Sequence, residues 1–410
     1  MRRPVVIAGW AVAASFALAA CGGGSSSGPA NINLWVFNEP SGSFKDAAKR
    51  CTDSSGGKYK VTLNALSNQA DQQRQSLVRR LAAKDSSIDI AGMDVVWTAE
   101  FAAAGWIKEW PTALAAQVKQ GTLPGPLATA TYQGKLYAAP ANSNTQLLWY
   151  RKDKVSKPAD TWTGLIAQAT NLKTHIEIQG AQYEGVMVWF NSLVQSAGGT
   201  IVKGTTVTLG PAGQVAANTM SKLAHSPAAD PSLASQHEDE NRLAFEAGTA
   251  YFEVNYPFVY PSAKTNAPDI YKNMAWAPYP GITPGTAAKA PIGGINWGVG
   301  AYTKHPNEAF AAAACMRNEE NEKEAAIKGG LPPTLESLYS DPELIKAYPF
   351  AALIRKQLAT AAVRPVTPAY ADVSLAVAKA VSPPTSIQTN GFVNSLRGTL
   401  KDALNSQALL

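Results

Sequence analysis

Strand-like and helix-like segments alternate regularly over the first part of this chain that follows its N-terminal segment. The expected strands and helices are, in order, 32–37, 43–51, 60–63, 71–84, 87–93 and 98–105. Short apolar runs bounded by turn residues predict the strands, and apolar residues on one helical face, such as Leu77 and Leu81, predict the helices. Ser43 is the expected N-cap of the first helix. This alternation predicts an α/β fold with a mostly parallel sheet covered by helices.

The middle of the chain departs from this pattern twice. Strands are expected over 136–140 and 146–151, with the polar residues 142–144 between them as a crossing point between two lobes. A Pro- and Gly-rich stretch over 277–294 predicts a second crossing. Without residues 1–20 the chain keeps 390 of its 410 residues, more than one hydrophobic core usually covers. Two lobes are therefore expected.

Periodicity predicts further elements in the second half. They are helices over 163–174, 188–196, 214–225, 241–247 and 307–328, a hairpin over 199–209 and a strand over 251–255. Gly329 and Gly330 are expected to end the last of these helices, because glycine readily adopts the left-handed conformation of a C-terminal cap.

The first 20 residues have the pattern of a secretory signal. Basic Arg2 and Arg3 precede an apolar run over 5–20, which is shorter than a bilayer-spanning helix. Leu18-Ala19-Ala20-Cys21 resembles the bacterial lipobox, which implies cleavage before Cys21 and acylation of its thiol by a fatty acid such as palmitate. The alternative is an ordinary signal peptide with an incidental cysteine. If Cys21 is lipidated, residues 21–30 comprise the lipidated cysteine and a flexible Gly/Ser linker, which together hold an extracytoplasmic domain at the outer face of the membrane.

Charge and cysteine content narrow the class of function. The formal charge of +6 falls to +4 without Arg2 and Arg3, and the remaining charges are scattered, so no nucleic-acid partner is expected. Cys51 and Cys315 are an even pair in an oxidising compartment. We expect a structural disulfide between them, and the alternative is two buried free thiols.

Motifs of catalysis and metal binding are almost absent. Residues 24–28, Gly-Ser-Ser-Ser-Gly, match the nucleophile-elbow pattern but lie in the linker and not between a strand and a helix. No P-loop, dinucleotide fingerprint, zinc-type His-Glu pair or Cys-x-x-Cys occurs. The four histidines are too dispersed along the chain to indicate a metal site; they are His175, His225, His237 and His305. We therefore expect no catalytic residue, no cofactor and no metal.

Aromatic residues are distributed among carboxylates and amides. Trp97 is near Asp94, Trp149 is near Asn144, and three aromatic residues surround two polar ones over 251–256. Sugars need this mixture, because their C–H faces lie on aromatic rings while their hydroxyls bond to carboxylates, amides and arginine. Core aromatics produce a similar pattern, so Trp97 could equally be a core residue.

Several sequence blocks carry a resemblance to a known family. The blocks are 94–106, 123–130, 144–151, 242–246, 292–294 and 361–365. They resemble extracellular solute-binding proteins of oligosaccharide ABC importers of the maltose and trehalose type, and among these the trehalose-binding lipoproteins of actinobacteria. The resemblance runs from residue 32 to residue 385 and keeps the order of the blocks.

The resemblance implies a periplasmic-binding-protein-like fold of type II. Such a fold has two α/β lobes, a hinge and an interlobe cleft that closes on the ligand. Lobe 1 would comprise residues 31–140 and 287–335, and lobe 2 would comprise residues 141–286 and 336–410.

The resemblance also implies a set of site residues. By position, the expected sugar ligands are Asp94, Asn144, Glu238, Tyr256, Gly294, Ile295 and Arg364, with Glu39, Asp71 and Gln72 at the rim. Arg364 would be a bidentate clamp on neighbouring hydroxyls, because its planar fork suits two acceptors. Alternatives stay open: Asp94 could cap a helix, Arg364 could pair with a surface carboxylate, and Asp71 and Gln72 could be the solvated start of a helix.

The implied function is sugar capture outside the cell. A monomeric, membrane-anchored lipoprotein would bind trehalose or a related α-glucosyl disaccharide and deliver it to the permease subunits of an ABC importer, whose ATP-binding subunit lies inside the cell. Tyr256 stands where the trehalose binders have Trp, and the stretch 262–273 is shorter, so maltose or another α-glucoside also fits. The alternatives are a glycoside hydrolase of α-glucosides that uses Asp94 and Glu238, and a lipoprotein that binds a peptide, a siderophore or another solute.

Overall fold

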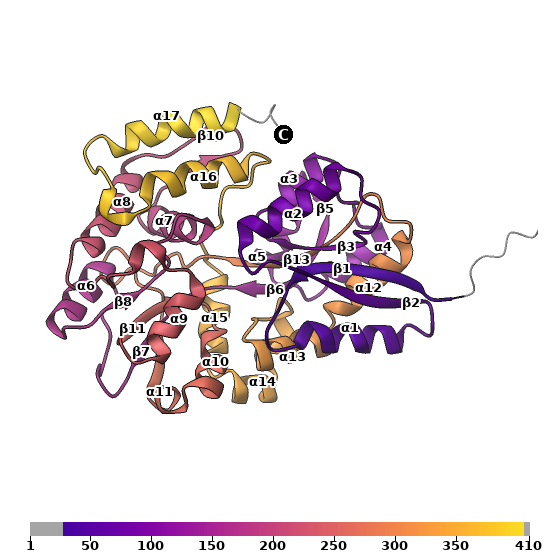
Figure 1. The fold of residues 1–410 in the computed structure, drawn as a ribbon, viewed down its shortest axis with the longest axis horizontal. Coiled ribbons are helices and arrows are strands. Elements are labelled where there is room, and N and C mark those ends of the chain that lie inside the picture. The colour runs from indigo at the N-terminus through magenta and orange to yellow at the C-terminus, as the bar shows by residue number, and fades with distance from the viewer. Residues whose placement is uncertain (1–27, 406–410) are drawn as a thin grey trace, which may run out of the picture.

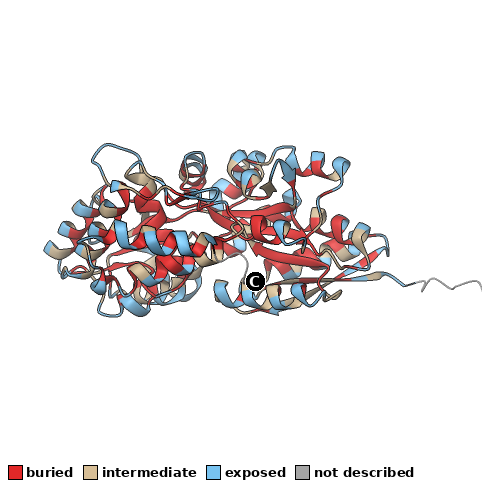
Figure 2. Cartoon of the chain, turned by 90° about the horizontal axis from the view of Figure 1, so that it is seen from above, coloured by how far each residue is buried: buried red, intermediate tan, exposed pale blue. Residues whose placement is uncertain are grey.

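The computed structural model describes residues 28–405, which form two lobes lying side by side (Figure 1). The predicted signal segment and the predicted lipidation site at Cys21 lie outside the described residues. Within the described range, no helix combines the length and the apolar content that crossing a bilayer requires. Figure 2 shows that buried residues run through both lobes and the region between them.

The first lobe is built on a five-stranded sheet with the order β2-β1-β3-β13-β6. Its strands are β1 (Ala30–Phe37), β2 (Tyr59–Leu66), β3 (Ile90–Asp94), β6 (Ala138–Asn144) and β13 (Gly293–Val299). β1 pairs in parallel with both β2 and β3, as the alternation of strands and helices predicts. β13 arrives from far along the chain and pairs antiparallel with β3 and β6.

Helices and a short hairpin surround this sheet. They are α1 (Ser43–Ser54), α2 (Ala70–Ala82), α3 (Thr98–Ala103), α4 (Thr112–Lys119), α5 (Pro124–Thr129), β4 (Thr131–Tyr132), β5 (Lys135–Leu136), α12 (Pro306–Met316) and α13 (Glu319–Gly329). In Figure 1, α1 and α2 lie on opposite sides of β1 and β2. Leu77 and Leu81, predicted to share one helical face, are fully buried in this core.

Cys51 of α1 is bonded to Cys315 of α12, so the predicted disulfide is present. The bond joins the first helix of the chain to a helix 264 residues further on. Both helices pack on the same lobe, so the disulfide fastens the two chain segments that together complete this core.

Two expectations about helix ends are wrong in detail. Ser43 is the first residue of α1 and not its N-cap, a position held by Gly42 with a left-handed φ of 79°. The carboxylate of Glu39 accepts the Ser43 N–H at 2.9 Å, and so takes over the task expected of a serine cap. The single helix expected over 307–328 is two helices, because the Asn318 side chain accepts the Asn321 N–H and starts a new one. Gly330, with φ 65°, ends this second helix as predicted.

The second lobe contains a four-stranded sheet with the order β12-β7-β11-β8. Its strands are β7 (Leu147–Arg151), β8 (Ile176–Glu177), β11 (Phe252–Asn255) and β12 (Met274–Ala277). Around it lie α6 (Trp162–Asn171), α7 (Glu184–Ser196), the hairpin β9 (Val202–Lys203) and β10 (Thr206–Val207), α8 (Pro211–Ala224), α9 (Glu238–Glu246), α10 (Val259–Asn266), α11 (Pro268–Asn273), α15 (Ala351–Leu358), α16 (Tyr370–Val381) and α17 (Phe392–Asn405). The helix α14 (Pro342–Ala347) lies beside α13 of the first lobe. Trp149 and Trp189 are fully buried in its core and are not available for stacking on a ligand.

The chain passes from the first sheet to the second between β6 and β7, and returns between β12 and β13. The expected crossing residues 142–144 belong to β6 itself, so the passage lies at Thr145 and Gln146, which are both buried. β6 therefore carries its polar end directly into the region between the lobes.

Candidate ligand-binding site

A cavity of about 320 Å³ lies between the two lobes. The first lobe contributes residues at the ends of its strands, among them Asp94 of β3 and Asn144 of β6. The second lobe contributes the beginnings of two helices, with Glu184 of α7 and Glu238 of α9. Strand ends of an α/β sheet are the usual place for a ligand, and the volume is in the range of small-molecule sites.

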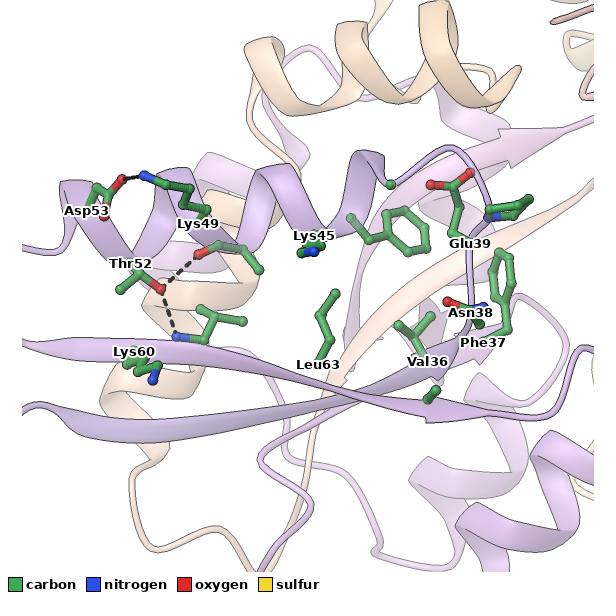
Figure 3. Close-up of a pocket in the computed structure, with 16 residues that line it drawn as sticks. Val36, Phe37, Asn38, Glu39, Lys45, Lys49, Thr52, Asp53, Lys60 and Leu63 are labelled. Atoms are coloured by element: carbon green, nitrogen blue, oxygen red, sulfur yellow. Dashed lines mark hydrogen bonds and ion pairs between the residues drawn. The ribbon is translucent and has the colours of Figure 1, made fainter. Parts of the chain in front are cut away.

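A larger hollow of about 720 Å³ runs beside α1 and the edge of the first sheet. Figure 3 shows Lys45, Lys49 and Lys60 along it, with Lys49 paired to Asp53. It is an open groove in which the Thr52 hydroxyl already bonds backbone groups on α1 and β2. The interlobe cavity is the better candidate site, because charged and unpartnered polar groups converge on it.

Arg364 ties the two sides of the cavity together. Its Nη2 donates to Asp94 Oδ1 at 2.9 Å, and its Nη1 donates to Glu184 Oε1. Glu184 also accepts hydrogen bonds from Tyr370 and Ser374 of α16. The Arg364 side chain is only 2% exposed, so this is a buried ion triad and not the surface pair considered as an alternative. Burial raises the pKa of Glu184, while the neighbouring guanidinium opposes that shift.

Five buried polar atoms of the residues that line the cavity have no hydrogen-bond partner among the described residues. They are Asn144 Oδ1, Asn142 Nδ2, Arg364 Nε, the Tyr183 hydroxyl and His237 Nδ1. Buried polar groups in native proteins are almost always bonded, and leaving one unpaired costs about 1–3 kcal/mol. The unpaired acceptor of Asn144 and the unpaired donors of Asn142 and Arg364 belong to residues that line one cavity, and they match a ligand that carries hydroxyl groups, since a hydroxyl both donates and accepts.

Glu238 lies at the first position of α9, beside Tyr183 and His237. Burial raises the pKa of Glu238, and the neighbouring Tyr183 hydroxyl and His237 partly offset this shift. The rings of Tyr183 and His237 are 4.3 Å apart. Tyr256 also lines the cavity, and burial raises the pKa of its phenol, which stays neutral. The second lobe therefore presents a carboxylate between aromatic surfaces, a combination that suits a sugar ring.

The backbone position of residue 294, in the lining of the cavity, can hold only glycine without strain. Its φ is +127°, and a Cβ there would lie 2.1 Å from the carbonyl oxygen of Asn142. The next residue, Ile295, donates its N–H to Asn142 Oδ1 at 3.1 Å. The close approach of β13 to β6 at this point therefore holds Asn142 and Asn144 in place.

We expect Gly294→Ala to weaken ligand binding and to destabilise the chain by at least about 1–3 kcal/mol, the cost of a strained backbone. Gly398→Ala is the matched control, because a Cβ there meets nothing within 4 Å and lies in the interior of α17. That control should be stabilising by about 0.5–1 kcal/mol. Thermal unfolding and ligand titration of both variants provide the measurement, and equal behaviour of the two would contradict the packing argument.

The predicted site residues fall into two groups. The cavity is lined by Asp94, Asn144, Glu238, Tyr256, Gly294, Ile295, Arg364 and Glu39. Both carboxylate oxygens of Glu39, however, accept hydrogen bonds at the start of α1, so its first task is to cap that helix. Asp71 and Gln72 are exposed on the first turn of α2, outside the lining, while Gln73 of the same turn lines the cavity.

The sequence analysis does not predict most residues of the cavity wall, and three polar ones among them are Asn142, Tyr183 and Glu184. Asn142 was noted only as part of a polar crossing, although its place in a polar run next to Asn144 was a usable signal. Tyr183 and Glu184 were missed because the helix was expected to begin at residue 188, whereas α7 begins at Glu184. No local signal marks Glu184, whose partners Arg364 and Tyr370 lie far along the chain.

The fold and the sequence both match known proteins. A probable ABC transporter-binding protein of Deinococcus radiodurans is 27% identical over 334 residues, covering 75% of this chain and 76% of that relative. Among solved structures, maltose-bound MalE3 of T. maritima superposes with a TM-score of 0.84 at 22% identity, covering 91% of this chain and 99% of that one. The GacH receptor of Streptomyces glaucescens, solved without ligand and with acarbose, gives a TM-score of 0.82 at 20% identity, covering 92% and 99%.

The structural likenesses agree with the expected two-lobed fold. The profile of one protein family, described as bacterial extracellular solute-binding protein, matches residues 40–323. This match spans most of both lobes, and the family consists of binding proteins and not of enzymes. The chain belongs to the bacterial extracellular solute-binding protein family.

Proposed function

We propose that this protein is the substrate-binding lipoprotein of an ABC sugar importer. It would be anchored at the outer face of the cell membrane through Cys21, bind trehalose or a related α-glucosyl disaccharide between its lobes, and deliver it to the permease as a monomer. The short Gly/Ser linker after Cys21 would keep the binding protein close to the permease and free to turn.

The unpartnered buried polar atoms of the cavity carry this proposal. Three polar atoms are already removed from water in the protein alone: Asn144 Oδ1, Asn142 Nδ2 and Arg364 Nε. A ligand that forms hydrogen bonds with them therefore offsets a desolvation penalty that the unliganded protein already carries. Charged partners such as Asp94 and Glu238 make hydrogen bonds about twice as strong as neutral ones, which suits the many hydroxyls of a disaccharide.

Relatives support the sugar class. The similar structures include a maltose-bound protein and a receptor for acarbose. The sequence blocks also resemble those of the actinobacterial trehalose-binding lipoprotein LpqY. Tyr256 replaces the Trp of that protein, so we infer a smaller stacking surface with an added hydroxyl. Because the chain is a binding protein and not an enzyme, the hydrolase alternative is dropped.

Binding would act by a shift of conformational population. Arg364 bonds Asp94 on the first lobe and Glu184 on the second, so its position depends on how close the lobes are. A disaccharide that bonds to both walls gains its full set of contacts only in the closed arrangement, and it therefore stabilises that arrangement.

Isothermal titration of the purified protein tests the proposal. Trehalose and maltose are the probes, cellobiose is the β-linked control, and a mixture of short peptides represents the non-sugar alternative. We expect one site per chain, with at least one α-glucosyl disaccharide binding at least about tenfold more tightly than cellobiose. Binding heat and thermal stabilisation that only the peptides produce would contradict the proposal. Absence of both signals with every probe would also contradict it.

The raised pKa of Glu238 makes a prediction about pH. Its pKa is above the ordinary value because partial burial removes water from the carboxylate, and a hydroxyl is best bound by the ionised form. Affinity should therefore fall as the pH is lowered through this raised pKa, which is higher than for an exposed glutamate. Titrations at successively lower pH should show this loss for the wild type, beginning at a higher pH than an exposed glutamate would give. Glu238→Gln should bind weakly with a flatter profile, and an unchanged profile would exclude Glu238 as an ionised ligand.

A further inference from the structure

A second cluster of ligand-type atoms lies in the second lobe, outside the interlobe cavity. His175, Glu177 and Asp230 each place one nitrogen or oxygen within 4.8 Å of the others. None of the three lines the cavity between the lobes. The histidines are too dispersed in the sequence to indicate a metal site, but the fold brings Asp230 from a later loop beside the residues around β8.

The backbone holds the two segments together. Ile176, between the histidine and the glutamate, forms a parallel bridge with Ala229, next to the aspartate. The Ile176 N–H donates to the carbonyl oxygen of Ala228 at 2.9 Å. The three side chains therefore project from β8, from the residue before it and from the loop that is bridged to it, which holds them close together.

In each carboxylate one oxygen is held by the protein. Asp230 Oδ1 accepts the Ser232 N–H at 2.7 Å, and its Oδ2 faces His175 Nδ1 at 3.5 Å. Glu177 Oε2 accepts a hydrogen bond from Gln236. Its Oε1 is buried with no hydrogen-bond partner among the described residues, and His175 Nδ1 is buried with no hydrogen bond beyond its ion-pair contact with Asp230. Donors that fix one oxygen of a carboxylate and leave the other open are typical of the outer shell of a metal site.

The electrostatics of the cluster favour a cation. Glu177 is 0% exposed, and in the described part of the chain neither it nor Asp230 pairs with a lysine or an arginine. Burial, and next the charge of Asp230, raise the pKa of Glu177 to about 8. A divalent ion would neutralise both carboxylates at once, and it has access from solvent because His175 and Asp230 are partly exposed.

We propose that His175, Glu177 and Asp230 bind one divalent transition-metal ion of the zinc type. One imidazole nitrogen and two carboxylate oxygens are a ligand set that suits zinc and its neighbours, whereas calcium and magnesium prefer oxygen ligands alone. Water would complete the coordination. The ion would fasten the loop before α9 to β8, and Gln236, which bonds both Glu177 and Asn241 of α9, would carry this effect toward the helix that presents Glu238.

The experiment uses the untagged protein, stripped with a chelator and titrated with ZnCl₂, MnCl₂ or CaCl₂. Calorimetry and thermal unfolding are recorded without sugar, so the result does not depend on the proposed sugar binding. His175→Ala and Asp230→Asn are the test variants, and His225→Ala, which removes an exposed histidine of the same lobe, is the matched control. Asp230→Asn keeps the size of the side chain and provides a folded variant if the alanine variant is unstable.

We expect one Zn²⁺ per wild-type chain, stabilisation by Zn²⁺ that exceeds that by Ca²⁺, and at least about a tenfold loss of affinity in Asp230→Asn and His175→Ala. His225→Ala should bind like the wild type. Absence of Zn²⁺ binding, equal Zn²⁺ binding by both test variants and the wild type, or a preference for Ca²⁺ that survives His175→Ala would overturn the proposal.

Discussion

We expect Arg364→Ala to abolish detectable sugar binding and to lower the free energy of unfolding by about 3–5 kcal/mol. Removing one member of a buried ion cluster leaves its partners without compensation, and this costs about that amount. Here Asp94 and Glu184 would face each other without the guanidinium between them. The variant also loses the unpartnered Arg364 Nε, a donor to the ligand in our proposal. Isothermal titration and urea unfolding at pH 7 measure the two effects.

Two further variants separate charge from geometry. Arg364→Lys keeps the positive charge but not the planar fork, so we expect it to recover much of the stability and little of the affinity. Arg355→Ala is the control, because that side chain is 49% exposed and pairs with Glu336 at the surface. Such surface pairs are worth about 0–1 kcal/mol. Wild-type affinity in both Arg364 variants would remove this residue from the binding site.

The second large effect concerns the Cys51–Cys315 disulfide. Its removal in the double variant Cys51→Ala/Cys315→Ala should lower the free energy of unfolding by about 2–5 kcal/mol, because the bond closes a very long loop and limits the unfolded chain. Urea unfolding of the oxidised wild type, the reduced wild type and the double variant gives the measurement. We expect the reduced wild type and the double variant to unfold at similar urea concentrations.

Sugar affinity provides the control for this prediction. The disulfide joins α1 and α12, and neither cysteine lines the interlobe cavity, so affinity should change by less than a few fold. Equal unfolding midpoints for the oxidised and reduced wild type would show that the loop-closure argument does not apply to this chain.

Much of the fold follows from local sequence. The parallel pairing of β1 with β2 and β3 was predicted because strand–helix alternation has few other solutions. Gly330 ends α13 as predicted, because a left-handed position favours glycine. The errors occurred where side chains override local propensity. Glu39 replaced Ser43 as the cap of α1, and the Asn318 side chain divided one expected helix into two.

The binding site likewise has features that the sequence predicts and features that only the tertiary structure shows. The sequence alone determined the α/β class, the two lobes and, through family resemblance, eight of the residues that line the cavity. Only the tertiary structure showed that Arg364 joins Asp94 to Glu184, and that Asp230 lies beside His175 and Glu177. The physical reason is sequence separation: periodicity and capping act over a few residues, whereas these charges meet because two lobes pack segments that are distant along the chain.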